Sequence, residues 1–131
     1  MAGLEQFLQG DNFARHLAIE LVEAAGGTAI ARLEVAEYHL NSHKTVHGAV
    51  LFALADVALE AASNSHGVVA VSINANISYM KAVSSGLLTA TATEVSLNST
   101  LGVYDIQITS PETGLVAVFQ GMVYRKKQRI E

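Results

Sequence analysis

The chain has 131 residues, enough for one domain over residues 1–131, and half of them are apolar, enough to fill one core. A formal net charge of −4 and a pI near 5.7 describe a mildly acidic surface that would repel a phosphate backbone, so no nucleic-acid partner is expected. The absence of cysteine excludes disulfides, thiolate metal sites and cysteine nucleophiles, and it favours a reducing, cytoplasmic location.

The N-terminal third is predicted to form short helical turns followed by a hairpin. Polar and charged side chains interrupt residues 1–16, which is compatible with helical turns and not with a secretion signal. Residues 17–24 and 28–39 have strand-like patterns, and Gly26-Gly27 between them is a hairpin signal. We therefore expect a first antiparallel pair.

A long apolar helix is predicted in the middle of the chain. Residues 40–47 are polar and loop-like, Gly48 begins the apolar run, and residues 64–67 form a C-terminal signal. The helix would have about sixteen residues and a length of about 24 Å. It carries Asp56 and Glu60, whose charges would be costly at membrane depth, so we expect a helix buried in protein and no membrane span.

Four long strands are predicted after the helix, over residues 68–80, 87–97, 100–110 and 115–125. Short stretches rich in turn-forming residues separate them, so we expect mostly antiparallel neighbours. A basic cluster lies at the C-terminus and consists of Arg125, Lys126, Lys127 and Arg129. This cluster is either a solvated tail or a contact for a phosphorylated small molecule.

The burial that these elements require predicts the fold. The helix is apolar on nearly every face and must be covered on most sides. A flat sheet covers only one side, whereas strands of this length can curl around a helix. The sequence therefore predicts an α+β protein with the hotdog fold, in which a long curved antiparallel sheet wraps around one central helix.

Generic catalytic and cofactor motifs are absent from the sequence. It has no G-x-S-x-G elbow, phosphate-binding glycine loop, dinucleotide fingerprint or H-E-x-x-H zinc helix. His43 and His47 are four residues apart, but they lie in a predicted loop with no third ligand type nearby. We therefore expect neither a metal site nor a cofactor.

Asp56 lies midway along the predicted helix, at the inner end of a polar stripe. Its same-face neighbours are apolar toward the N-terminus, whereas Glu60 and Asn64 continue the stripe toward the C-terminus. The stripe is either an ordinary solvated face or the lining of a cleft. In a cleft, Glu60 would disfavour the ionised form of Asp56.

Gly48 lies at the N-terminus of the helix, where unpaired backbone N–H groups and the positive end of the helix dipole meet. A carbonyl oxygen that gains negative charge would be stabilised there, and glycine would let a ligand approach closely. The alternative is a plain turn into a helix.

Two segments resemble the phenylacetic-acid-degradation (PaaI-type) branch of the hotdog thioesterases. Residues 47–58 (His-Gly-Ala-Val-Leu-Phe-Ala-Leu-Ala-Asp-Val-Ala) and 62–67 (Ala-Ser-Asn-Ser-His-Gly) are similar to its signature, roughly H-G-G-x-x-x-x-L-A-D-x-A followed by N-S-x-G. The likeness extends over residues 13–125 and includes residues 76–80 and 102–106.

The resemblance implies a thioesterase that hydrolyses an aromatic or medium-chain acyl-CoA. It implies that Asp56 is the catalytic carboxylate and that Gly48 supplies the backbone N–H that polarises the thioester carbonyl. Asn41 and His47 match polar positions that place this carbonyl or the attacking water. Ser72 matches a hydroxyl that positions water in a related branch.

Other residues of the expected site would bind substrate. Val50 and Leu54 would line the acyl pocket, Asn64 would also bind substrate, and Lys81 would contact a phosphate group. Lys81 stands where the family often has arginine. Ala49 replaces a second glycine of the family pattern, which would narrow the approach to the helix end.

The spacing of Gly48 and Asp56 agrees with the family's mode of assembly. Eight residues separate them, or about 12 Å along a helix axis, too far for both to touch one thioester carbon. Two such helices running antiparallel across a two-fold axis would bring Gly48 of one subunit near Asp56 of the other. The resemblance implies this homodimer, commonly paired into a homotetramer.

Two alternatives to hydrolysis are left open. A hotdog dehydratase or hydratase would use His47 with Asp56 on an acyl thioester. A non-catalytic module would bind acyl-CoA without turnover.

Overall fold

The computed structural model describes residues 2–130. Helices α1 (Ala2–Gln9) and α2 (Asn12–His16) precede the hairpin of β1 (Glu20–Ala25) and β2 (Thr28–Glu34), and a short 3-10 helix, η1 (Glu37–His39), leads to the central helix α3 (Gly48–Asn64). Four strands follow, β3 (Val68–Tyr79), β4 (Leu87–Leu97), β5 (Leu101–Ser110) and β6 (Gly114–Arg129).

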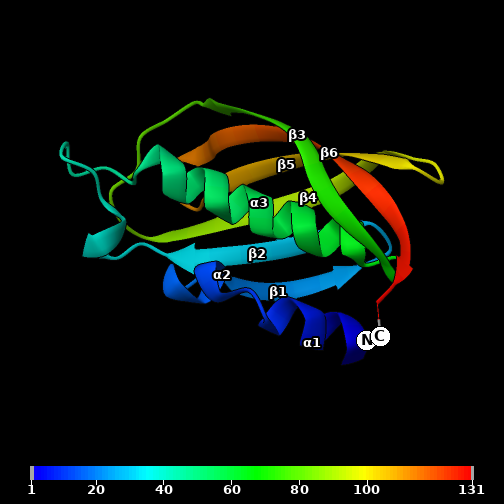
Figure 1. The fold of residues 1–131 in the computed structure, drawn as a ribbon. Helices are drawn as coiled ribbons and strands as arrows, with labels where there is room; N and C mark the ends of the chain where they lie inside the picture. Colours follow the sequence, from blue (N-terminus) through cyan, green and yellow to red (C-terminus); the bar gives the residue numbers. More distant parts are fainter. Residues whose placement is uncertain (1, 131) are drawn as a thin grey trace.

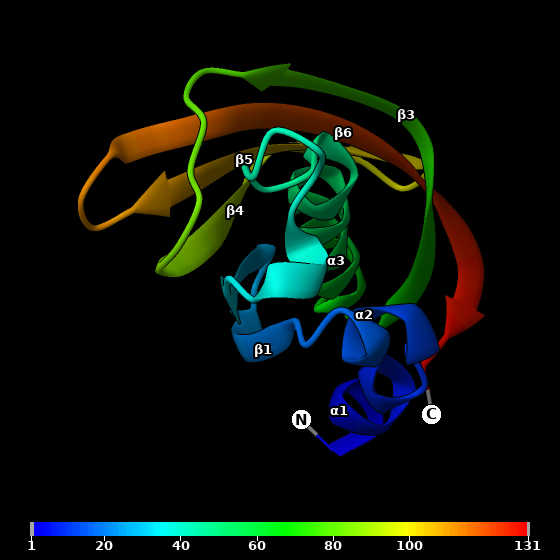
Figure 2. The same ribbon diagram turned by 90° about the vertical axis from the view of Figure 1, so that its left-hand side faces the viewer.

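All six strands form one antiparallel sheet in the order β1-β2-β4-β5-β6-β3. The sheet curls around α3, which contacts every strand (Figures 1 and 2). Helices α1 and α2 lie beside β1, and α2 also contacts α3. The wrapped helix confirms the predicted hotdog architecture.

Small side chains let the sheet close tightly on α3. Leu54 is completely buried, and four alanines of the helix are completely buried as well: Ala55, Ala58, Ala61 and Ala62. Gly121 of β6 lies so near the helix that a Cβ there would be 2.6 Å from Leu59 Cδ2. Close packing against the curled sheet explains why most faces of the helix are apolar. Within residues 2–130, no helix is long and apolar enough to cross a membrane.

Both predicted strands of the first hairpin have wrong boundaries. The first begins at Glu20, because Leu17 still belongs to the end of α2. The second ends at Glu34, and η1 follows. His39 holds this turn in place, because its buried ring accepts the Ala36 N–H at Nδ1 (2.9 Å) and donates from Nε2 to the Leu17 carbonyl (2.8 Å).

The prediction that the last four strands are mostly neighbours in chain order holds only in part. Strands β4, β5 and β6 pair in succession, but β3 pairs with β6 and β4 pairs with β2. The segment between β3 and β4 therefore crosses over β5 and β6. Strand β6 continues to Arg129, so the basic cluster lies on a strand and is not a tail.

The edge strand β3 has little cover. Between residues 71 and 79 its side chains are exposed, except for the half-buried Ile77. Val71, Ile73 and Tyr79 retain 38%, 55% and 53% of their exposed area. An edge strand with free backbone groups and exposed apolar side chains is a surface on which another chain can pair.

Candidate active site

The N-terminus of α3 presents a backbone N–H with no acceptor. His47 caps the helix, because its Nδ1 accepts the Ala49 N–H at 3.1 Å and its carbonyl accepts the Val50 N–H at 2.9 Å. The N–H of Gly48, by contrast, has no hydrogen-bond acceptor among residues 2–130. A free donor therefore remains at the positive end of the helix dipole.

Tyr79 of β3 lies against Gly48. Its hydroxyl donates to the Gly48 carbonyl at 3.1 Å, and a Cβ on Gly48 would be 3.1 Å from the ring Cζ. That separation is tighter than ordinary van der Waals contact, so glycine allows the ring to approach this closely. The half-exposed tyrosine leaves this end of the helix open to solvent.

Asp56 lines a hollow of about 570 Å³ between α3 and the N-terminal helices. The wall contributed by α3 includes Phe52 and Val57, and the opposite wall comes from residues 7 and 10–13. The side chain of Asp56 is half-buried. Of the two interpretations of the polar stripe, the structure therefore favours a cleft at this position.

The hollow raises the pKa of two carboxyl groups. Burial raises the pKa of Asp56, and the charge of Asp11 raises it further. Burial also raises the pKa of Glu60 to about 7, with contributions from the charge of Asp11, a hydrogen bond to Asp11 and the charge of Asp56. The sequence predicted that Glu60 would disfavour ionised Asp56, whereas burial and Asp11 have this effect in the structure.

A single chain does not bring Gly48 and Asp56 together. Their separation on one helix is about 12 Å along the axis. Gly48 is also not among the described residues that line the hollow of Asp56. A small reacting group can therefore contact Gly48 and Asp56 together only if the two residues come from different copies of α3.

The fold of this chain occurs in known proteins. Residues 43–117 match the Thioesterase superfamily. The chain belongs to this family. The thioesterase is 36% identical over 118 residues to acyl-coenzyme A thioesterase PaaI of Escherichia coli, covering 89% of this chain and 84% of that protein.

Solved structures agree with this assignment of the thioesterase. The PaaI protein of Escherichia coli superimposes with a TM-score of 0.93 and 32% identity, covering 99% of this chain and 95% of that one. A hypothetical thioesterase protein from Streptococcus pneumoniae TIGR4, solved with coenzyme A, has a TM-score of 0.87 and 25% identity, with 95% and 98% covered. These matches confirm the prediction of a PaaI-type hotdog thioesterase.

Two residues that were predicted to bind substrate lie in the interior of the thioesterase. Asn64 and Leu54 are both 0% exposed. Asn64 Nδ2 donates to the carbonyls of Glu60 (2.8 Å) and Ala70 (3.2 Å), and its Oδ1 accepts the Ala70 N–H (2.9 Å). We correct both assignments: Leu54 is a core residue, and Asn64 joins the end of α3 to β3 because a buried amide must be hydrogen-bonded within the protein.

The remaining predicted residues lie outside the hollow of the thioesterase. Val50 is 7% exposed, Ser72 is exposed on β3, and Lys81 Nζ donates to the Thr113 carbonyl at 2.9 Å. Asn41 Oδ1 accepts two backbone N–H groups of its own loop. Their roles toward substrate stay predictions. No cluster of three or more metal-ligating side chains occurs within residues 2–130.

Sequence reasoning assigned no role to Asp11 or Tyr79, although both contact the site. Asp11 caps α2 by accepting the Ala14 N–H at 3.0 Å, a local signal that indicates a helix start but not its proximity to α3. Tyr79 lies in a segment that resembles the family, yet nothing in the strand pattern shows its contact with Gly48. Both contacts join residues that are far apart in the chain.

Proposed function

We propose that the thioesterase hydrolyses acyl-CoA at sites shared by two subunits. In each site Asp56 is the nucleophile or general base, and the N–H of Gly48 polarises the thioester carbonyl. The observation that carries this proposal is the free N–H of Gly48 at the positive end of α3. A donor in this position stabilises the oxyanion that forms when the carbonyl is attacked.

Two routes lead to the same products. As a base, ionised Asp56 takes a proton from water, and the water oxygen bonds to the acyl carbon. As a nucleophile, Asp56 bonds to this carbon itself and forms an anhydride, which water then cleaves. In both routes the tetrahedral intermediate expels the CoA thiolate. A single turnover in heavy-oxygen water separates them, because only the anhydride route can place the label on Asp56.

The proposed substrate class is inferred from the names of two similar proteins. The Escherichia coli relative is named for acyl-coenzyme A, and the Streptococcus pneumoniae protein was solved with coenzyme A. We take the acyl group to be aromatic or medium-chain, as the family resemblance implies. The cytoplasmic location stays a prediction.

The shared site requires a homodimer, and dimers of this kind can pair into a homotetramer. The exposed edge of β3 supports this assembly, because antiparallel pairing with a second β3 would extend the sheet across a two-fold axis. The two central helices would then lie side by side and antiparallel. Gly48 could then approach Asp56 of the partner subunit, whereas the two residues of one helix are about 12 Å apart along its axis.

Substitution of Asp56 tests the proposal. Asp56→Asn should lower thiol release from acyl-CoA by roughly 10²- to 10⁴-fold, because the amide is neither base nor nucleophile. Circular dichroism and sedimentation should remain those of the wild type. Asp105→Asn, at an exposed carboxylate of β5, is the matched control and should keep full activity.

Other outcomes would contradict this function. Near-normal hydrolysis by Asp56→Asn would show that the carboxylate takes no part in the mechanism. Hydration of an enoyl thioester without release of thiol would favour the dehydratase alternative. Tight binding of acyl-CoA without any turnover would favour the non-catalytic module.

A further inference from the structure

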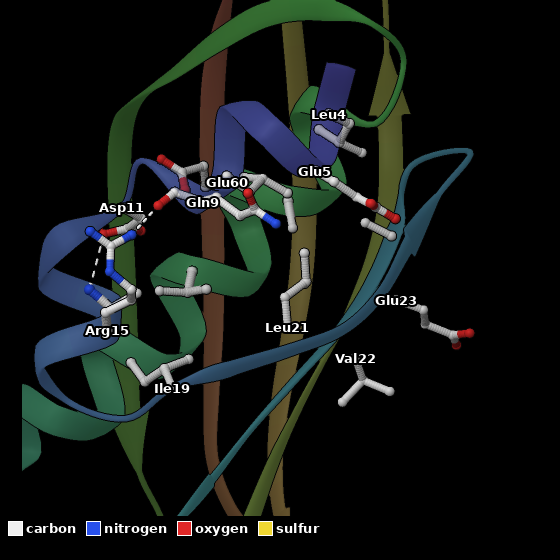
Figure 3. A pocket seen from close by; sticks show the side chains of 15 residues that line it. Leu4, Glu5, Gln9, Asp11, Arg15, Ile19, Leu21, Val22, Glu23 and Glu60 are labelled. Atoms are coloured by element: carbon white, nitrogen blue, oxygen red, sulfur yellow. Dashed lines mark hydrogen bonds between the residues drawn. The ribbon is translucent and has the colours of Figure 1, made fainter. Parts of the chain in front are cut away.

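A second cavity lies under the N-terminal helices, between α1, α2, β1 and α3 (Figure 3). Its volume is about 410 Å³, which is in the size range of small-molecule pockets. Apolar side chains that line it come from α1, from the turn between α2 and β1, from β1 and from α3: Leu4, Leu8, Ile19, Leu21, Val57 and Ala61.

The cavity has an apolar interior and a polar rim. Leu4, Ile19 and Ala61 are 3%, 9% and 0% exposed. Glu5 and Arg15 also line the cavity, but both are exposed. Because an apolar cavity of this size leaves its lining without contact partners, an apolar ligand would gain dispersion and hydrophobic contacts there.

This cavity adjoins the hollow of Asp56. Asp11, Val57 and Glu60 line both spaces. Glu60 is about 6 Å beyond Asp56 along the helix axis, and Ala61 is one residue further on. A chain attached to a carbonyl near Asp56 therefore needs only a few bonds to enter the cavity.

We propose that the cavity binds the aliphatic tail of the acyl group, so that the preferred substrate is an unbranched medium-chain acyl-CoA. This inference rests on the proposed function, since it places the thioester at Asp56. The tail runs along α3 past Val57 and ends between α1 and β1. Each chain thus supplies an acyl pocket of its own beside the shared catalytic groups.

The charges along this path are compatible with an apolar tail. Glu60 has its pKa raised to about 7 and shares a hydrogen bond with Asp11, so at neutral pH a large fraction of Glu60 is uncharged. Arg15 bonds to the Gln9 carbonyl and to the Asn12 side chain, which ties α1 to α2 above the cavity. The polar contacts that join α1 to α2 therefore lie at the rim of the cavity and not in its interior.

Ala24 of β1 offers a direct test. It lines the cavity and is half-buried, so Ala24→Leu should fill space that the tail needs. Relative to the wild type, kcat/KM for decanoyl-CoA should fall by roughly tenfold or more, and kcat/KM for acetyl-CoA should stay unchanged. The neighbouring Ala25 is exposed, and Ala25→Leu is the matched control that should leave both values unchanged. Equal effects on the two substrates, or no effect on either, would overturn the inference.

A binding measurement separates this inference from the proposed function. Calorimetry with free decanoate needs no turnover. The wild type and Ala25→Leu should bind decanoate, and Ala24→Leu should bind it roughly tenfold more weakly. If the wild type hydrolyses no acyl-CoA but binds decanoate in this pattern, the proposed function fails and the apolar pocket stands. If hydrolysis occurs but Ala24→Leu binds decanoate as well as the wild type, only the pocket assignment fails.

Discussion

Gly48 combines a free N–H with close contact to an aromatic ring, and two substitutions separate these properties. Proline at the first helical position lacks the N–H but has a suitable φ. His47, with φ −59° and ψ 134°, already has the extended conformation that a residue before proline requires. Alanine keeps the N–H and adds only a Cβ near Tyr79, whose half-exposed ring can move.

We predict that Gly48→Pro lowers kcat for thioester hydrolysis by about 10²- to 10³-fold, since it removes one oxyanion donor. Gly48→Ala should retain most of this activity. Steady-state kinetics of both variants, with circular dichroism to verify the helix, provide the measurement. Equal losses in the two variants would show that crowding at the helix end matters and that the N–H does not.

Glu60 is a carboxyl group whose pKa is clearly raised by its surroundings. Its folded-state pKa is about 7, against an ordinary value of 4.5. Between these values the folded protein binds more protons than the unfolded chain, so stability falls as pH rises through this window. The favourable contribution of the neutral carboxyl is complete below pH 4.5 and is lost above about pH 7.

Glu60→Gln should therefore change the pH dependence of stability. The variant cannot ionise at this position, so its melting temperature should rise relative to the wild type between pH 4.5 and about 7 and then run parallel to it. Glu23→Gln is the control, because Glu23 is exposed on β1. Parallel melting curves for Glu60→Gln and wild type across the whole range would contradict the assigned shift.

Strand β3 is the element on which the proposed assembly depends. Its exposed apolar side chains would be buried if a second copy paired with this edge. Ile73 falls at an irregularity of β3 between Ser72 and Asn74, and it is 55% exposed. Val95 falls at a similar irregularity of the interior strand β4, between Glu94 and Ser96, and it is 56% exposed.

We predict that Ile73→Lys shifts the protein to a monomer and removes most hydrolysis, because a lysine at this edge opposes strand pairing. Analytical ultracentrifugation and thiol release measure the two effects. Val95→Lys should keep both the oligomer and the activity. An active Ile73→Lys monomer would contradict the shared site.

At the scale of the whole molecule, the question is whether each site uses two chains. A hybrid dimer of one Gly48→Pro subunit and one Asp56→Asn subunit answers it. If the groups come from different subunits, one of the two sites carries both defects and the other carries none. Each parent variant, in contrast, has a defect in both sites.

The hybrid should therefore regain about half of the wild-type activity per dimer. Two affinity tags allow it to be purified from both parents and assayed for thiol release. A hybrid as inactive as its parents would show that each subunit supplies both groups of a site.

Local patterns in the sequence determined the main elements and the fold. The helix that begins at Gly48 and the strands β3 to β6 were predicted within a few residues, because burial against one core imposes a period on the side chains. The wrapped sheet followed from a helix that is apolar on nearly all faces. The proposed roles of Gly48 and Asp56 came from the resemblance and stay predictions.

Only the tertiary structure decided which distant residues meet. It placed β3 beside β6, brought Asp11 over Glu60, set Tyr79 against Gly48 and buried Asn64 between α3 and β3. Periodicity along the chain shows which face of an element is buried, but it does not show which other element covers that face. These contacts depend on the path of the whole chain around α3, and the contact of Asp11 with Glu60 lies where the hollow and the cavity adjoin.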